Sequence, residues 1–274
     1  MKKIICPTDF SEAANNAIEY AAKLAQKLNI ELEILHVQLV SAANPISSGI
    51  EACEYITPTS KVLEKMCVDI RKTFSIPCNH SIETTSKTLE KAITGKSDEN
   101  NLIIMGTNGT DDLYQYFFGT NSHHVIEKSK CPVLVIPEGV TYGTIKKIIF
   151  AWDYGHESKT SFFQLNDLFK ANDVEITFLH VSKEKNPVSD DVFRALKEDV
   201  HSYFGYKENI AFDRIYSEST GTFPDKIDEY MNDVKADLLT ITFYDRGALR
   251  NIFHGTIAKG LSEIAGYPLL VLHV

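Results

Sequence analysis

The stretch that decides the fold is Leu102-Ile103-Ile104-Met105-Gly106-Thr107-Asn108-Gly109, followed after nine further residues by Gly119-Thr120. Its apolar run predicts a buried strand, the first two glycines predict a loop, and the third glycine with its threonine predicts a helix over residues 121–130. Backbone N–H groups of such a loop gather beside the positive end of a helix dipole, which is typical of phosphate binding. The P-loop motif is excluded, because no lysine follows the third glycine.

Composition and charge narrow the class of protein. The chain has 274 residues, 43% of them hydrophobic and 24% charged, which suits one large or two ordinary domains of a soluble protein. Its net charge of −9 argues against a nucleic-acid or anionic-membrane surface, and no apolar run approaches the roughly 20 residues of a membrane span. The five cysteines contain no C-x-x-C pair, which argues against a disulfide framework or a structural zinc site and predicts a cytoplasmic protein.

An internal repeat divides the chain into two halves. Residues 2–10 recur as 146–154 and residues 35–37 as 179–181, both at an offset of 144. Residues 119–120 recur as 255–256 and residues 132–136 as 268–272, both at an offset of 136. Four ordered matches with one deletion indicate a tandem duplication. We predict a first domain over residues 1–138, a linker over 139–145 and a second domain over 146–274.

Strands and helices alternate in each half, which predicts an α/β fold with parallel sheets. Helices are expected between the strands, including one that Ser11 caps and one that starts at Thr57-Pro58 after a long polar loop. In parallel sheets, ligands lie beyond the carboxyl ends of the strands, where the strand order reverses. The turns after the first and fourth strands would line one crevice if those strands are neighbours, which the alternation alone leaves open. The expected strands are residues 3–7, 30–37, 80–84, 102–105 and 133–136, and in the second half 147–152, 175–181, 210–216, 238–242 and 269–273.

These features resemble the universal stress protein family, over nearly the whole chain and twice. The resemblance rests on residues 7–11, 35–37 and 131–136, and above all on the glycine spacing G-x2-G-x9-G-[ST], the family's ATP-binding signature. It implies two tandem doubly wound, Rossmann-like domains, each a five-stranded parallel sheet of order 3-2-1-4-5 with helices on both faces. It also implies ATP or a related adenine nucleotide in the crevice between the first and fourth strands of the first domain.

The resemblance also implies which residues hold the nucleotide. The turn after the first strand would meet the ribose or adenine, the end of the fourth strand would lie beneath the ribose and phosphates, and the glycine loop with the following helix start would hold the phosphates. Glycines allow positive φ and close backbone approach, and an ionised aspartate accepts hydrogen bonds from hydroxyl or amine groups. The residues are Pro7, Thr8, Asp9, Val37, Met105, Gly106, Gly109, Gly119, Thr120, Asn121 and Ser122.

Each of these features also has a purely structural interpretation. Gly106 and Gly109 could simply form a tight turn after a strand. Asp9 could cap the first helix together with Ser11, and Thr120 could be an N-cap without any ligand. The third glycine at the matching spacing favours the binding interpretation.

The segment between the second and third glycines departs from the family's pattern. Family members commonly carry basic residues there, whereas residues 110–118 contain Asp111 and Asp112 and no base. Phosphate contacts would then rest on uncharged donors, which predicts weak triphosphate affinity or a divalent ion such as Mg²⁺ between the phosphates and the carboxylates. A solvated loop tip is the plainer interpretation of these two aspartates.

The second half keeps the strand and helix pattern but lacks most of the signature. Thr242 and Asp245 stand where Gly106 and Gly109 would be, and Trp152 replaces Thr8. We therefore expect this half not to bind ATP in the family's manner, and to act as a partner for the first half.

The remaining candidates for chemistry are few. His36 and His180 occupy matching positions in the two halves, which predicts a structural role, and no histidine shows metal-ligand spacing with cysteine or carboxylate. No strong general base marks the phosphate loop. The sequence favours a nucleotide-responsive stress or regulatory module rather than an enzyme. A slow Mg²⁺-dependent ATP hydrolase and an interaction protein with an empty site stay open. Pairing of the two domains through their last strands is expected, and a homodimer is left open.

Overall fold

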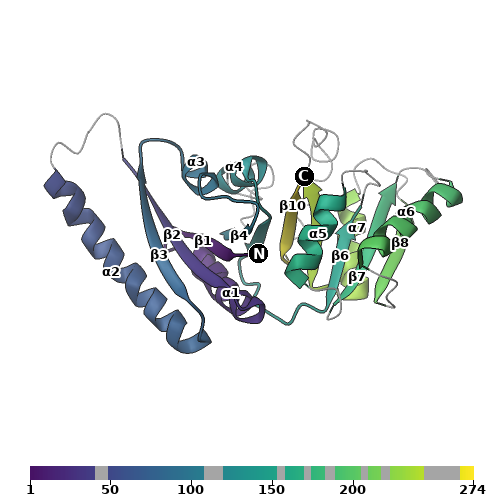
Figure 1. Ribbon diagram of the computed structural model, residues 1–274, viewed down its shortest axis with the longest axis horizontal. Coiled ribbons are helices and arrows are strands. Elements are labelled where there is room, and N and C mark those ends of the chain that lie inside the picture. Colours follow the sequence, from purple (N-terminus) through teal and green to yellow (C-terminus); the bar gives the residue numbers. More distant parts are fainter. Residues whose placement is uncertain are drawn as a thin grey trace. The chain divides into compact units, whose positions relative to one another are not determined.

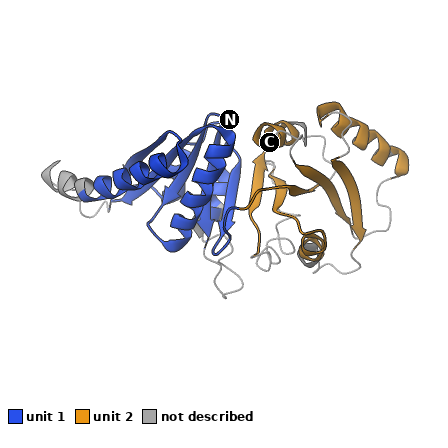
Figure 2. Cartoon of the chain, turned by 90° about the horizontal axis from the view of Figure 1, so that it is seen from below, with its two compact units in different colours: residues 1–108, 118–142 blue, residues 109–117, 143–274 orange. Residues whose placement is uncertain are grey.

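The computed structural model of the chain describes residues 1–40, 49–107, 120–152, 158–169, 174–182, 189–204, 209–216, 223–243 and 266–274. The described residues up to Tyr142 form one compact unit, and those from Gly143 onward form a second (Figure 2). This boundary lies within the linker predicted over residues 139–145.

The first unit alternates strands and helices from its first residues to its last (Figure 1). Its elements are β1 (Lys3–Thr8), α1 (Glu12–Leu28), β2 (Glu31–Leu39), α2 (Gly49–Phe74), β3 (Cys78–Thr85), α3 (Leu89–Thr94), β4 (Asn101–Thr107), α4 (Thr120–Lys128) and β5 (Val133–Pro137).

The second unit repeats this alternation in the part of the chain that the structure describes. Its elements are β6 (Lys147–Ala151), α5 (Ser158–Phe169), β7 (Glu175–Ser182), α6 (Asp190–Phe204), β8 (Ile210–Tyr216), α7 (Phe223–Val234), β9 (Leu238–Phe243) and β10 (Leu269–His273).

Both units contain the predicted sheet. The strand order is β3-β2-β1-β4-β5 in the first unit and β8-β7-β6-β9-β10 in the second, which is the order 3-2-1-4-5 twice. All pairs within each unit are parallel. In the first unit, α1 and α2 lie on one side of the sheet, and α3 and α4 lie on the other (Figure 1). The predicted fold class is therefore confirmed.

Helix α1 has well-defined ends and an alanine-rich buried face. The Ser11 side chain accepts a hydrogen bond from the Ala14 N–H, as expected of an N-cap. At the other end Asn29 adopts the left-handed conformation at φ 54° and returns its N–H to carbonyls of the last turn. The small buried side chains let the helix lie close to the sheet; they are Ala13, Ala14, Ala17, Ala21, Ala22 and Ala25.

Helix α1 approaches β4 so closely that only glycine fits at residue 106. A Cβ atom on Gly106 would lie 2.2 Å from the carbonyl oxygen of Ala13 and 2.5 Å from its carbonyl carbon. Glycines allow positive φ and close backbone approach, and Gly106 uses only the second property, because it is an extended residue of β4 that pairs with Ile136. The close approach in the structure is to the backbone of helix α1.

Helix α2 is longer than the sequence indicated. The predicted start at Thr57-Pro58 was wrong: the helix begins at Gly49 and contains Pro58. Proline lacks an N–H and normally disfavours a helix interior, which is why the sequence pattern suggested a start there. Pro58 is exposed, so water can solvate the backbone groups that its ring leaves unpaired.

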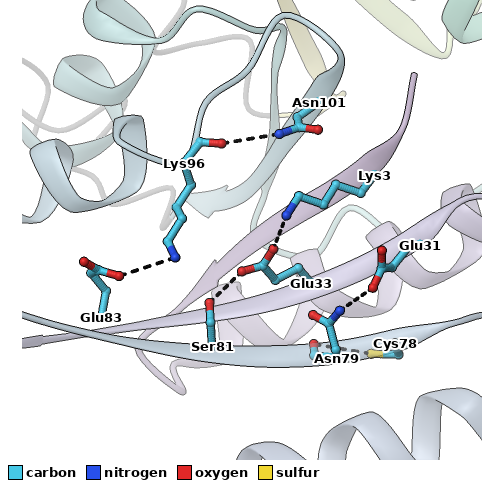
Figure 3. A network of polar contacts seen from close by, with 9 residues as sticks. All are labelled: Lys3, Glu31, Glu33, Cys78, Asn79, Ser81, Glu83, Lys96 and Asn101. Atoms are coloured by element: carbon cyan, nitrogen blue, oxygen red, sulfur yellow. Dashed lines mark hydrogen bonds and ion pairs between the residues drawn. The ribbon is translucent and has the colours of Figure 1, made fainter.

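Three strands of the first unit are joined on one face by a buried carboxylate. Glu33 on β2 accepts from Lys3 Nζ on β1 at 2.5 Å and from Ser81 Oγ on β3 at 2.6 Å (Figure 3). Only 9% of the Glu33 side chain is exposed. Burial raises the pKa of Glu33, but the bonds from Lys3 and Ser81 outweigh burial and hold the pKa below its ordinary value.

This network predicts a pH-dependent stability. Glu33→Gln should lower the free energy of unfolding by about 2 kcal/mol at pH 7, because a neutral amide replaces the carboxylate that accepts hydrogen bonds from Lys3 and Ser81. Since the folded pKa is lowered, this stabilisation is complete above the unfolded pKa, near 4.5, and is lost as the pH falls through the folded value. Urea titrations followed by circular dichroism should show the variant and the parent converging below pH 4.5. The control Glu31→Gln, at an exposed contact with Asn79, should change little, and a pH-independent effect at Glu33 would contradict the assignment.

A second prediction concerns the contact between α1 and β4. Gly106→Ala should destabilise the first unit by about 1–3 kcal/mol, because both neighbouring atoms belong to the backbone and the helix must move. Gly143→Ala is the matched control, since an added Cβ there meets nothing within 4 Å. Denaturant midpoints measured by circular dichroism test the pair, and equal midpoints for the two variants would refute the packing argument.

Candidate functional site

The carboxyl ends of β1 and β4 are neighbours in the first unit. The two strands pair in parallel from Lys3↔Asn101 to Ile5↔Ile103, and β1 pairs with β2 on its other side. The adjacency that the alternation left open, and that the resemblance implied, is confirmed. The turn after β1 and the loop after β4 therefore leave the same edge of the sheet, at the point where strand order reverses.

The turn between β1 and α1 is held by its own side chains. Thr8 Oγ1 accepts from the Phe10 N–H at 3.0 Å, and Asp9 Oδ1 accepts from the Ser11 N–H at 3.0 Å. Ser11 Oγ in turn accepts from the Ala14 N–H at 3.2 Å, and Phe10 adopts a positive φ of 67°. The structural role considered for Asp9 is thus present. It uses Oδ1 of an exposed carboxylate and leaves acceptor capacity on the second oxygen.

The Asp9 carboxylate is suited to remain ionised. Partial burial raises its pKa, but hydrogen bonds from Ser11 and the electrostatic effect of His36 outweigh burial, so the pKa of Asp9 lies below its ordinary value. An ionised carboxylate can accept from ribose hydroxyl groups or an adenine amino group, and it repels phosphate. This chemistry agrees with a place at the sugar or base.

A histidine fastens the end of the first strand in each unit. His36 Nδ1 lies 2.9 Å from the Thr8 carbonyl oxygen, and its ring packs on Phe10 with the centroids 4.9 Å apart. His180 Nδ1 lies 2.8 Å from the Trp152 carbonyl oxygen. Because a carbonyl only accepts, Nδ1 carries the proton in both rings. The predicted structural role of this histidine pair is confirmed.

The other predicted residues near the base and ribose are partly enclosed. Pro7 and Val37 are half-buried near the carboxyl ends of β1 and β2, and Thr8 and Met105 are buried. The Thr8 hydroxyl accepts a hydrogen bond within the turn, and its own O–H group can still donate.

The phosphate half of the predicted site is only partly described. Gly109 and Gly119 lie outside the described residues, as do the side chains of Thr120 and Asn121. Helix α4 begins at Thr120, which confirms the helix start predicted after the third glycine. Ser122 lies in its first turn and is buried. The first turn of any helix presents free N–H groups beside the positive dipole end.

Sequence reasoning missed Gln38, the residue after Val37 on β2. Its side-chain Oε1 is buried and has no hydrogen-bond partner in the described structure. A buried amide oxygen without a donor is costly, so such an atom marks a place where a donor from elsewhere would be favourable. Residue type and spacing carry no signal for this, because the burial comes from packing around the end of β2.

The second unit fills the position equivalent to Thr8 with a large side chain. Trp152 is only 5% exposed and packs in an aromatic cluster. Ring centroids lie 6.4, 5.7 and 6.3 Å from the Trp152 ring for Phe162, Phe178 and Phe212 respectively. This indole contributes to the core of its own unit rather than to an open crevice wall.

Thr242, the residue equivalent to Gly106 in the second unit, makes a different contact with the neighbouring helix. Thr242 Oγ1 bonds to Ser161 Oγ on α5 at 3.0 Å, where the first unit has a bare glycine against the helix backbone. Asp245, Gly255 and Thr256 lie outside the described residues.

The described residues contain neither a cluster of metal-binding side chains nor a helix that could span a membrane. No group of three or more His, Cys, Asp or Glu side chains is gathered for a metal among the described residues, and Asp111 and Asp112 fall outside them. None of the described helices has the length and apolar character needed to cross a membrane.

Comparisons with known proteins agree with this architecture. A family model described as the universal stress protein family matches residues 1–137. Universal stress protein Slr1230 of Synechocystis is 24% identical, over 98% of this chain and 99% of its own. The solved universal stress protein of Archaeoglobus fulgidus matches 99% of this chain and 96% of its own, with a TM-score of 0.72 at 15% identity.

Two shorter family structures contain a nucleotide. One is a universal stress protein in complex with cAMP, and the other is an Arabidopsis thaliana member with AMP bound. Their TM-scores of 0.39 and 0.34 are too low to carry an argument about the ligand of this chain. The match of the family model to half of the chain, together with the repeated sheet order, shows that the chain belongs to the universal stress protein family.

Proposed function

We propose that the first unit binds ATP or a related adenine nucleotide beyond the carboxyl ends of β1 and β4, and that the chain acts as a nucleotide-responsive stress or regulatory module. The observation that supports this most is the parallel pairing of β1 with β4. It brings the Asp9 turn and the start of the glycine loop to one edge of the sheet, with α4 beginning at the end of that loop.

The proposed contacts divide the nucleotide between two sets of groups. Asp9 would accept from the ribose or adenine, with Pro7, Thr8 and Val37 around the base, and Gln38 Oε1 is a further acceptor nearby in sequence. Met105 and Gly106 would lie beneath the ribose and phosphates. The groups proposed for the phosphates are Gly109, Gly119, Thr120, Asn121 and Ser122, whose uncharged donors would be supplemented by the dipole of α4.

A bound nucleotide would act by shifting an equilibrium. Phosphates that bind the loop between β4 and α4 would favour the conformation that binds them, by a free energy that depends on the nucleotide concentration. A partner that distinguishes the two conformations would then respond to nucleotide. The alternative function is slow Mg²⁺-dependent ATP hydrolysis, with the ion bound near Asp111 or Asp112. Both residues lie outside the described residues.

The second unit is proposed to serve as a partner that does not bind ATP in the same way. We also propose that the last strand of each unit, β5 or β10, pairs with the other within one chain. Each is the final strand of its own order of five, and a free sheet edge exposes unpaired N–H and C=O groups. Pairing would cover both edges and gives a physical reason for the duplication.

Asp9→Asn tests the proposed role of the carboxylate. Asparagine keeps an oxygen for the Ser11 N–H and removes the charge, so we expect the turn to persist and ATP affinity to fall about tenfold, as for a lost charged hydrogen bond. Isothermal calorimetry with ATP, with and without magnesium, measures the change. Asp153→Asn, at the repeated position in the second unit, is the matched control and should leave affinity unchanged. Equal effects at both positions, or no heat from the parent protein at millimolar ATP, would refute the proposed site.

Gln38→Met tests whether the unpartnered acceptor serves the ligand. Methionine has a similar shape without the amide, so the unliganded protein should be as stable as the parent or slightly more stable. If a nucleotide group donates to Oε1, thermal shift by saturating ATP should be smaller in the variant than in the parent. An unchanged ligand-induced shift would show that Gln38 has no part in binding and would leave the Asp9 test standing.

A further inference from the structure

Two cysteine thiols meet between α2 and β3. Cys67 on α2 is fully buried and Cys78, the first residue of β3, is 4% exposed. Each thiol is the largest influence on the pKa of the other, and Cys78 Sγ also lies 4.0 Å from the Asn79 carbonyl oxygen. Figure 1 shows α2 running alongside β3, the outermost strand of the first unit's order, so the thiols lie between the sheet edge and its covering helix.

A row of polar side chains holds the helix against this strand. Arg71, one turn after Cys67, donates from Nη1 to the Cys78 carbonyl oxygen at 2.6 Å and from Nη2 to Glu64 at 2.5 Å. The other Glu64 oxygen lies 3.4 Å from His80 Nδ1, whose Nε2 is 3.2 Å from Ser60 Oγ. These contacts fix the position of α2 over β3 and thereby keep the two thiols together.

The surroundings of the two thiols shift their pKa values in opposite directions. The hydrogen bond from Cys78 lowers the pKa of Cys67, and the charge of Arg71 acts in the same direction, while burial opposes both. The same thiol contact, with burial, raises the pKa of Cys78. Because the thiolate is the nucleophile, Cys67 is suited to react first and Cys78 to remain a thiol that reacts second.

We propose that Cys67 and Cys78 are an oxidation site, at which a hydroperoxide converts the two thiols into an intramolecular disulfide that ties α2 to β3. Because both thiols are buried, the oxidant would reach them when the contact between α2 and β3 opens locally. The link would fix the outer strand to its helix and so reduce local opening at this edge of the unit.

The reaction balances with hydrogen peroxide as the oxidant. The Cys67 thiolate sulfur attacks one peroxide oxygen, the O–O bond breaks, and the departing hydroxide takes up a proton to become water. The resulting sulfenic acid is attacked by the Cys78 sulfur, the S–O bond breaks, and the hydroxyl leaves as water with the Cys78 thiol proton. Overall, two thiols lose two electrons and two protons, and one peroxide becomes two waters.

Peptide mapping of the full chain tests the proposal. After brief treatment with hydrogen peroxide, free thiols in the denatured protein should fall from five to three per chain, and the intact mass should fall by about 2 Da. Tryptic digestion without reductant should give residues 66–71 joined to residues 73–87, and reduction should release them. Amide hydrogen exchange in residues 78–85 should slow in the oxidised protein and recover after reduction.

Matched variants separate this pair from the other cysteines. Cys67→Ala should abolish the joined peptides, whereas Cys131→Ala and Cys53→Ala should retain them. The wild-type map needs no variant, so the proposal stays testable if Cys67→Ala fails to fold. Five thiols after oxidation, a link from Cys67 to another cysteine, or a link between two chains would overturn it.

Discussion

The close contact between α1 and β4 is the constraint on which the first unit depends. Only three residues separate the end of β1 from the start of helix α1, yet the helix lies against β4, with the Ala13 carbonyl group over Gly106. This contact requires small residues on both sides, which the helix supplies as alanines and the strand as glycine. It also holds the start of α1, which follows the Asp9 turn, against β4, and so acts together with the pairing of β1 and β4 that brings the two parts of the candidate site together.

The two units show which parts of this arrangement belong to the fold and which belong to the site. The histidine bond to the end of the first strand is present in both, at 2.9 and 2.8 Å, so it belongs to the framework that the two units share. The glycine contact is not repeated, because Thr242 meets a serine hydroxyl instead. At the position that Thr8 occupies in the first unit, the second unit has Trp152, whose ring packs in a cluster of phenylalanine side chains. A duplicated sheet has therefore kept its framework while the surroundings of one crevice changed.

The alternation of strands and helices and the internal repeat could be predicted from the sequence, because the periodicity of apolar residues is a local property and both halves show it. Strands β1 and β4 are adjacent in the sheet although they lie far apart in the sequence, and only the family resemblance predicted that adjacency. Gly106 shows the limit of motif reasoning: the motif predicts a role in nucleotide binding, whereas the contact that requires glycine in the structure is with Ala13, more than 90 positions earlier in the chain. Helix α2 and Gln38 illustrate the same limit, since exposure of Pro58 and burial of one amide oxygen depend on tertiary packing.

The centre and the edge of the first unit are stabilised in different ways. At the centre, most side chains of β1 and β4 are buried, and the backbone of α1 lies in close contact with β4. At the outer strand, β3 buries only its first residue, Cys78, while α2 is attached by its buried Leu63, Cys67 and Ile70 together with the polar row from Ser60 to Arg71. Because β3 has few buried side chains of its own, local opening should begin at β3 and not at the central strands. The proposed nucleotide site at the centre and the proposed thiol pair at the outer strand would therefore respond to different signals without disturbing each other.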